Sequence, residues 1–260
     1  MAPGGAAFYR DRGLERRLRN VEAARRRVTS DFFEDNMHAP EIGKQSVARA
    51  ERRGAPVDTI DRSGVLARTM LGVPIKFGAG GEIYGEGEPI EYVYEVIHGA
   101  ARTIKILSDG RRKIGGFYFA GDIFGLEEGQ EHRLSAEAIA DSVVCVIKRR
   151  TLLRMAGYDR DLARQLLAVT SRELTRVQHH SLMLIETAQE RVSSFLLEMV
   201  GRISVGDLIV LPMSRQDIAD YLGVTIETVS RTFTILENTS AIAMPNSRAV
   251  VLRDRAALWQ

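Results

Sequence analysis

The sequence has almost no cysteine, since Cys145 is the only one in 260 residues. A single thiol cannot build a disulfide framework within one chain, and it cannot supply the several thiolates of a zinc or iron–sulfur site. Cys145 lies in the apolar stretch "SVVCVI", so we expect an inert core thiol, with a redox switch as the alternative. This cysteine usage fits a reducing cytoplasm.

Long apolar runs are also missing. No stretch reaches the roughly 18 residues that a membrane-spanning helix needs, and the N-terminal residues lack the apolar core of a signal peptide. Lys and Arg number 36 against 34 Asp and Glu, a net charge of +2 that by itself indicates no polyanionic partner. We therefore expect a soluble cytoplasmic protein with no membrane partner.

Motifs for catalysis and for metal or phosphate binding are absent as well. The five histidines show no paired metal spacing, and the adjacent His179 and His180 would diverge by about 100° on a helix, one toward solvent and one toward an interface. "IGKQS" lacks the first glycine of a phosphate loop, and the glycines of "FGAGGEIYGEG" are too scattered for a dinucleotide fingerprint. No nucleophile, base and orienting group occur together. We expect neither an enzyme nor a bound metal or cofactor.

The composition changes along the chain, which indicates four segments. Residues 1–60 form an Arg-rich N-terminal extension with few apolar residues, either a loosely helical tail or a nucleic-acid arm, and Met37 is an alternative start. Residues 61–156 hold short strand-like runs such as "YVYEVIHG", "ARTIKIL" and "KIGGFYF". Asp109-Gly110 is a typical hairpin turn between two of these runs. This segment is predicted to be a small β sandwich or barrel.

Residues 157–189 are predicted to form one long helix with two apolar stripes. The first stripe follows a heptad seam at steps of three and four: Leu167, Thr170, Leu174, Val177, Ser181, Leu184 and Ala188. The second stripe consists of Leu162, Leu166 and Val169. One stripe can cover the β segment while the other pairs with a second copy, so we expect a homodimer held by Leu167, Leu174, Val177, Ser181 and Leu184. The alternative is that both stripes are buried within one chain.

Residues 190–260 contain a helix-turn-helix pattern. Ser214 is a good N-cap with Asp217 three positions later, Gly223 ends this helix, and Thr225 caps the next. Small and branched apolar residues allow the two helices to cross closely. These residues are Ala219, Leu222, Val224, Val229 and Ile235. The following "AIAMPNSRAVVLRD" predicts a strand, turn and strand, a wing with Arg248 at its turn.

The second helix carries the candidate DNA-reading residues. If Val229 and Phe233 face the core, an outer face remains for Ile226, Glu227, Ser230 and Arg231. Arg can bind guanine bidentately, Glu can accept from cytosine, and Ile can contact a thymine methyl. An ordinary surface ion pair between Glu227 and Arg231 is the alternative. We expect Ser214, Arg215 and Thr225 to complete the DNA-binding set, with Ser214 and Arg215 near phosphate.

This order of segments resembles the CRP/FNR family of bacterial transcription regulators from about residue 70 to the end. The stretch "RQDIADYLGVTIETVSRTFTILE" carries the resemblance. It implies an α+β fold: an N-terminal β-roll (cyclic-nucleotide-binding-like) domain, a long dimerisation helix and a C-terminal winged helix-turn-helix. Glu227, Ser230 and Arg231 look like the FNR and FixK branch, which implies TTGA-type inverted half-sites. The resemblance also implies an activator that contacts RNA polymerase through the hairpin at residues 108–112; a plain solvated turn is the alternative.

The chain also departs from the family pattern. FNR proteins hold an iron–sulfur cluster with several cysteines, which this chain lacks. Cyclic-nucleotide members bind phosphate through an Arg-Ser or Arg-Thr pair, whereas "HRLSAEA" places Arg133 one position away from such a pair. The Gly that commonly precedes the wing is missing. These departures imply a FixK-like protein that is active without a bound cofactor; the alternative is a regulator of the same fold gated by a small molecule or cyclic nucleotide.

Overall fold

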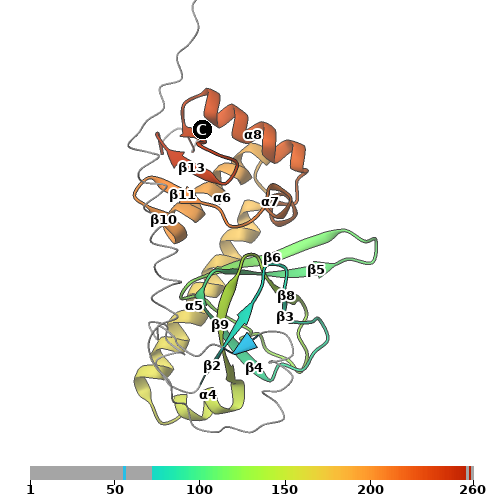
Figure 1. Cartoon of the computed structure of the whole chain (residues 1–260), viewed down its shortest axis with the longest axis vertical. Helices are drawn as coiled ribbons and strands as arrows, with labels where there is room; N and C mark the ends of the chain where they lie inside the picture. The colour runs from blue at the N-terminus through green and yellow to red at the C-terminus, as the bar shows by residue number, and fades with distance from the viewer. Residues whose placement is uncertain (1–54, 57–71, 256–257, 259–260) are drawn as a thin grey trace, which may run out of the picture. The chain divides into compact units, whose positions relative to one another are not determined.

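The computed structural model describes residues 55–56, 72–255 and 258 (Figure 1). Almost all of the predicted extension at residues 1–60, with Met37 and the "IGKQS" stretch, lies outside the described residues. All of these residues belong to one compact unit of the chain.

Two antiparallel sheets form the first part of this unit. The strand order in one sheet is β1-β2-β9-β4-β7, and in the other it is β3-β8-β5-β6. The strands are β1 (Ala55–Pro56), β2 (Val73–Phe77), β3 (Glu82–Tyr84), β4 (Tyr92–His98), β5 (Ala100–Ile106), β6 (Arg112–Phe119), β7 (Ile123–Phe124), β8 (Ser135–Ala138) and β9 (Ser142–Lys148). The β-rich segment expected from the alternating runs is thus confirmed, and Cys145 lies buried in β9.

The predicted hairpin turn joins β5 to β6. Gly110 has a φ of 82°, in the left-handed region that glycine adopts without steric cost. The Asp109 carboxylate accepts a hydrogen bond from the backbone N–H of Arg111 at 3.0 Å. Asp109 and Gly110 therefore close the hairpin in the way their turn chemistry predicts.

Alternation of side chains along the strands gives each sheet two buried faces. Inner residues such as Phe77, Tyr94 and Val144 pack between the two sheets. Outer residues of the β4 sheet, including Val93 and Ile147, form a second cluster with later helices. The outer face of the β5–β6 sheet joins a third cluster, which also contains the core of the C-terminal helices. A single chain therefore has one continuous apolar contact between its β-roll and its helix-turn-helix.

Helices α4 (Arg149–Ala156) and α5 (Arg160–Met183) follow the β-roll. The Asp159 carboxylate caps α5 by accepting from the N–H groups of Asp161 and Leu162. The second predicted stripe is confirmed, because Leu162 and Val169 are buried against the β-roll and Leu166 packs beside them. This stripe attaches α5 to its own chain.

The prediction of one continuous helix to residue 189 is wrong at its C-terminal end. Helix α5 stops at Met183, Leu184 is its C-cap, and α6 (Ala188–Ile203) begins after a short turn. The new start is a capping box, in which Thr187 and Glu190 each satisfy the other's backbone N–H. The apolar periodicity continues across this break, but Ala188 is the first residue of α6 and therefore does not belong to the α5 seam.

The C-terminal part combines helices with a small sheet. After α6 come β10 (Ser204–Val205), β11 (Leu208–Val210), α7 (Arg215–Leu222), α8 (Ile226–Asn238), β12 (Ile242–Ala243) and β13 (Ala249–Leu252). The sheet order is β10-β11-β13-β12, all antiparallel. The predicted wing is confirmed as the β12–β13 pair, whose turn is closed by Asn246 accepting from the N–H groups of Arg248 and Ala249.

The missing glycine before the wing is replaced by Ser240. Its φ of 61° makes it the one non-glycine residue with positive φ in the described part of the chain. The N–H of Ser240 donates to the Glu237 carbonyl, and the N–H of Ala241 donates to the Leu236 carbonyl. This is the Schellman pattern that ends a helix at a left-handed residue. Helix α8 therefore ends in a common C-terminal motif that leads into the wing, with backbone strain at Ser240.

We expect Ser240→Gly to raise the free energy of unfolding by about 1 kcal/mol, because glycine enters the left-handed region without the clash that an L side chain suffers. Ser247→Gly is the matched control, since Ser247 is exposed and has no positive φ. It should leave stability unchanged or lower it. Chemical denaturation of both variants measures the difference, and equal stabilities would contradict the strain at Ser240.

Candidate nucleic-acid interface

Helices α7 and α8 are joined by a tight, well-capped turn. Ser214 and Asp217 form a capping box at the start of α7. Gly223 ends the helix in the left-handed conformation, with φ 66°. The Thr225 hydroxyl then accepts from the N–H of Thr228 to cap α8. The helix-turn-helix predicted from these residue types is confirmed in its bounds and in its caps.

The outer face of α8 is open to solvent. Glu227, Ser230 and Arg231 are exposed, whereas Val229 and Phe233 on the opposite side are fully buried. Ile226 is partly buried, because it also packs against the core. The pKa of Glu227 is lowered by hydrogen bonds from its own backbone N–H and from the Thr225 hydroxyl, so its carboxylate is ionised at neutral pH.

Two polar groups on this face are available for other partners. Among the described residues, Glu227 and Arg231 form no ion pair with each other, so the surface-pair alternative does not describe this structure. The face thus presents one acceptor and one cation near the start of a helix, the end that enters a major groove in helix-turn-helix proteins.

The structure places the two phosphate candidates differently. Ser214 is exposed, but its hydroxyl already caps α7. The Arg215 guanidinium lies over the Phe233 ring, 3.3 Å from its centroid, and its Nη2 donates to the Met244 sulfur. Its Nη1 is buried without a hydrogen-bond partner, and burial lowers the pKa of Arg215 to about 10. Arg215 remains a cation at neutral pH, and it has an unused donor.

The seam of α5 faces away from its own chain. Leu167, Leu174 and Val177 are 68%, 58% and 50% exposed. The hydroxyl of Ser181 donates to the Val177 carbonyl within the helix, so it brings no unpaired polar group to the seam. Leu184 lies at the C-cap and is 38% exposed. The alternative of two stripes buried within one chain does not fit the described residues.

Aromatic rings fill the interior of the β-roll. Tyr84, Tyr94 and Phe124 lie within 6.2 Å of one another by ring centroids. His132, from the stretch that corresponds to the nucleotide clamp, stacks on Tyr84 at 3.7 Å and is 2% exposed. Its Nδ1 lies 2.6 Å from a Glu127 carboxylate oxygen. His132 is therefore part of the packed interior.

Carboxylates surround the entrance beside His132. The pocket there is lined by Lys105 and Arg133 and by three glutamates, Glu86, Glu128 and Glu131. Lys105 is already paired with Glu86, and Arg133 is exposed. An anionic ligand would meet more negative than positive charge at this entrance.

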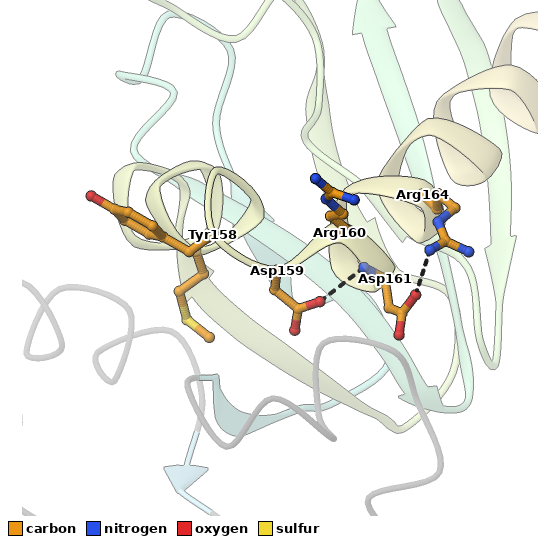
Figure 2. Close-up of a pocket in the computed structure, with 6 residues that line it drawn as sticks. Tyr158, Asp159, Arg160, Asp161 and Arg164 are labelled. Carbon is orange, nitrogen blue, oxygen red and sulfur yellow. Dashed lines mark hydrogen bonds and ion pairs between the residues drawn. The ribbon is translucent and has the colours of Figure 1, made fainter.

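A second surface pocket lies where α4 meets α5 (Figure 2). Its polar side chains already have structural partners: Asp159 caps α5, and Asp161 pairs with Arg164 at 3.1 Å. In the part of the chain with described coordinates, no three His, Cys, Asp or Glu side chains gather as metal ligands. None of the helices described combines the length and apolar character that a bilayer crossing requires.

His179 and His180 separate as their helical spacing predicts. His179 is exposed, whereas the His180 ring packs 4.1 Å from the Tyr221 ring on α7. Burial lowers the pKa of His180, and the charges of Arg176, Lys113 and His179 lower it further. His180 is therefore neutral at neutral pH, and it lies at the contact between α5 and the helix-turn-helix.

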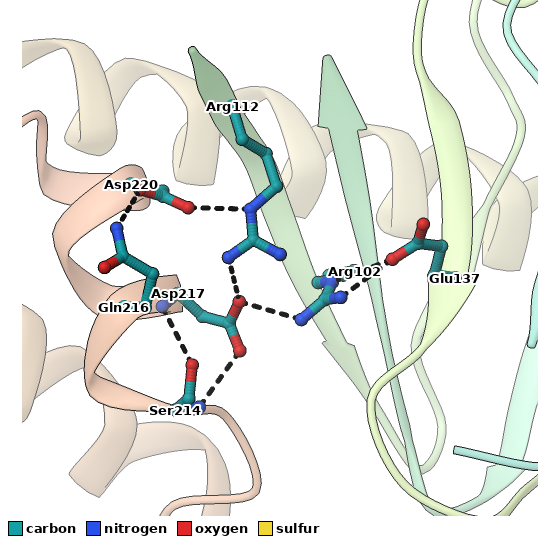
Figure 3. Close-up of polar contacts among 7 residues, drawn as sticks. All are labelled: Arg102, Arg112, Glu137, Ser214, Gln216, Asp217 and Asp220. Carbon is teal, nitrogen blue, oxygen red and sulfur yellow. Dashed lines mark hydrogen bonds and ion pairs between the residues drawn. The ribbon is translucent and has the colours of Figure 1, made fainter. Parts of the chain in front are cut away.

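A cluster of charged residues behind α7 was not predicted from the sequence. Asp217, expected only as a capping residue, is 3% exposed and also binds Arg102 and Arg112 of the β-roll (Figure 3). Arg102 and Asp217 are 115 residues apart in sequence. The sequence shows only that Arg102 interrupts an otherwise apolar face of a predicted strand. This pattern does not identify the residue that Arg102 binds.

A β-roll, a long helix and a winged helix-turn-helix with an open polar face define a DNA-binding transcription regulator. Residues 74–159 match the family model of the cyclic nucleotide-binding domain, and residues 190–260 match that of the Crp-like helix-turn-helix domain. The chain is 45% identical to the nitrogen fixation regulation protein FixK of Azorhizobium caulinodans, over 79% of this chain and 85% of that protein. It is 38% identical to the transcriptional activatory protein AadR of Rhodopseudomonas palustris, over 65% and 73%.

The structure of FixK2 from Bradyrhizobium japonicum is similar, with a TM-score of 0.69 and 49% identity over 72% of this chain and 95% of that one. The chain belongs to the CRP/FNR family, in its FixK-like branch. It is a DNA-binding transcription activator of the FixK type. The relatives compared are regulators rather than enzymes.

We expect stability to fall as the pH is lowered from 7 to 5, partly because of His180. The pKa of His180 in the folded protein lies below the usual 6.5, so the unfolded chain binds the proton more tightly. Acid therefore stabilises the unfolded state relative to the folded state. His180→Gln should therefore show a smaller loss of unfolding free energy between pH 7 and pH 5 than the unaltered protein. His179→Gln, at the exposed neighbour, should keep most of the loss, because burial is the main cause of the lowered pKa of His180 and the charge of His179 is the smallest one. A loss of the same size in both variants would show that His180 is not the titrating group.

Proposed function

We propose that the protein acts in the cytoplasm as a homodimer that places one copy of α8 in each of two successive major grooves, about 34–36 Å apart. It would then read a pseudo-palindromic site with TTGA-type half-sites, as the resemblance at Glu227, Ser230 and Arg231 implies. The observation that carries the proposal is the open polar face of α8 behind a fully capped α7. This role is regulatory and involves no catalysis.

Each residue on the face has a chemical role in base reading. Arg231 can donate two hydrogen bonds to guanine O6 and N7, and Glu227 can accept from the N4 group of a cytosine. Ser230 can act as a donor or an acceptor, and Ile226 can contact a thymine methyl. This set suits a half-site that holds a G·C pair beside T·A pairs.

Contacts to the DNA backbone would set the register of α8. Thr225 and Ser214 lie at the starts of the two helices, where backbone N–H groups favour phosphate. Arg215 lies beside them, only partly buried, and keeps a positive charge at neutral pH that favours a nearby phosphate. Arg248, exposed on the wing, can add a further cation.

The exposed seam of α5 supports dimerisation. Leu167, Leu174 and Val177 leave a large apolar area in water, and pairing with a second copy would bury it. Ser181 and Leu184 extend this face toward the helix-turn-helix. A two-fold axis along α5 would relate the two recognition helices and account for an inverted repeat.

Two features of the β-roll support activity without a bound effector. The aromatic cluster with His132 occupies its interior, and the carboxylates at the entrance oppose a phosphate. The turn of the β5–β6 hairpin at residues 108–112 is our candidate surface for RNA polymerase. Residues 108–111 are exposed, whereas Arg112 is bound to α7.

Selection of binding sites from random DNA, with purified protein and no ligand, should return an inverted TTGA-type repeat. Arg231→Ala should weaken binding to this site by about 1–3 kcal/mol and relax the preference at one base pair, because a bidentate base contact is lost. The control is Arg248→Ala, which should weaken binding to all sequences alike. A selected consensus that Arg231→Ala leaves unchanged would contradict the proposed reading, and specific binding only after a small molecule is added would support the ligand-gated alternative.

Leu174→Glu should shift the protein from dimer to monomer, because it places a charge in the centre of the apolar seam. Thr175→Glu adds the same charge at an exposed position on the side of α5 away from the seam and should leave the dimer intact. Sedimentation equilibrium of both variants measures the change. Dimers of equal strength would show that α5 does not pair through this face.

A further inference from the structure

Two arginines of the β-roll extend onto the first helix of the helix-turn-helix (Figure 3). Arg102 on β5 donates from Nη1 to Asp217 Oδ1 at 2.7 Å. Arg112 on β6 donates from Nη2 to the same oxygen at 2.6 Å and from Nε to Asp220 Oδ2 at 2.7 Å. Asp217 and Asp220 are on α7, so these three bonds connect two structural parts that are far apart in sequence.

The groups in this cluster are held from both sides. Glu137 on β8 accepts from Nε and Nη2 of Arg102, at 3.2 and 2.8 Å. The second oxygen of Asp217 accepts from the N–H of Ser214, and the second oxygen of Asp220 accepts from the Gln216 amide. None of the four charged groups that meet at α7 can turn freely, so the cluster fixes an orientation as well as a distance.

Burial strengthens this constraint. The side chains of Asp217, Asp220 and Arg102 are 4%, 13% and 15% exposed, and that of Arg112 is 26% exposed. Separating such groups without a replacement partner leaves a charge in a poorly solvated place, which is costly. The cluster therefore resists rotation of α7 against the β-roll more than an exposed ion pair would.

Contacts around Phe117 also hold the helices in place against the β-roll. Its carbonyl accepts from Arg176 on α5 and from Arg202 on α6, at 2.6 and 2.7 Å. Its ring lies 5.1 Å from that of Tyr221 on α7 and 6.2 Å from that of Phe195 on α6. Strand β6 is thus bound to three successive helices.

The recognition face is exposed while all of these contacts are made. Glu227, Ser230 and Arg231 are open to solvent in the same structure in which Asp217 and Asp220 are bound to the β-roll. The cluster therefore belongs to a conformation in which α8 can reach DNA. A regulator gated by a ligand would have to gain such a conformation through its ligand.

We propose that Arg102 and Arg112 are positioning residues, which hold the helix-turn-helix in its DNA-ready orientation by binding Asp217 and Asp220 from the β-roll. The inference rests on the proposed function, since an orientation matters only if two copies of α8 must meet two half-sites together. It assigns the β-roll a structural task in DNA recognition that needs no ligand.

The test compares full-length variants on three DNAs: the selected inverted repeat, the same repeat with two extra base pairs between its halves, and a single half-site. Arg112→Gln removes both contacts to α7. We expect its affinity for the correctly spaced repeat to fall at least about fivefold, the range of an intramolecular coupling. Its affinity for the single half-site should stay unchanged, because each α8 keeps its own chemistry. General destabilisation would not produce this difference between the two DNAs.

Two further variants test whether a change in net charge alone could explain weaker DNA binding. Arg111→Gln removes the same charge from the neighbouring position. Among the residues that the structure describes, Arg111 pairs with Asp109 in the turn and not with α7, so the DNA binding of this variant should not change. Asp220→Asn removes a negative charge from the DNA-binding helices, which by itself would strengthen attachment to DNA. Loss of positioning predicts the opposite, weaker binding to the correctly spaced repeat. Asp220→Asn also decides the case if Arg112→Gln fails to fold.

The outcomes separate the two proposals. If the unaltered protein shows no preference for the repeat over unrelated DNA, the proposed function fails. If it binds the repeat specifically and discriminates against the extra spacing, but Arg112→Gln and Asp220→Asn do so equally well, the positioning role of the β-roll arginines is wrong and the proposed function stands.

Discussion

The carboxylate of Asp217 is the group on which the arrangement of this protein most depends. One of its oxygens closes the capping box of α7, and the other accepts from Arg102 and Arg112 of the β-roll. A carboxylate that is 3% exposed is tolerated in a folded protein only when its hydrogen bonds are complete. The same side chain therefore caps the first helix of the helix-turn-helix and attaches this helix to the β-roll.

The apolar core also connects the β-roll to the C-terminal helices. Residues of the outer β5–β6 face, such as Ile114 and Phe117, belong to one cluster with Phe195 and Leu222 of the C-terminal helices. The inner face of that sheet packs against the other sheet. The rings of Tyr84, Tyr94 and His132 fill the interior of the β-roll. A domain of the cyclic-nucleotide-binding type can thus be used as a support for DNA-binding helices.

The features that could be predicted from sequence are those set by local chemistry. The caps at Ser214 and Thr225 and the end at Gly223 depend on residues within a few positions of one another, so the helix-turn-helix and its outer face were predictable. The strands and the Asp109-Gly110 hairpin follow from alternation and turn preferences. The second stripe of α5 was predictable because helical spacing alone places Leu162 and Val169 on one side.

Other features depend on competition or on distant partners. The end of α5 at Met183 was missed because the apolar periodicity continues, while the capping box at Thr187 starts a new helix. Ser240 in the left-handed region was not predictable, since the surrounding fold imposes that conformation on a residue that does not favour it. The pairing of Arg102 with Asp217 across 115 positions required the three-dimensional structure.

The chain itself is proposed to hold its recognition helices in place for DNA, without an effector. The direct measurement is the distance between spin labels at Asn238→Cys in the two copies of the dimer. Asn238 is exposed and is the last residue of α8, far along the helix from the base-reading residues near its start. The one native thiol, Cys145, is buried. We expect one narrow distance distribution in the ligand-free protein that stays the same when the inverted repeat is added. A broad distribution that narrows or moves only when DNA or a small molecule binds would contradict it.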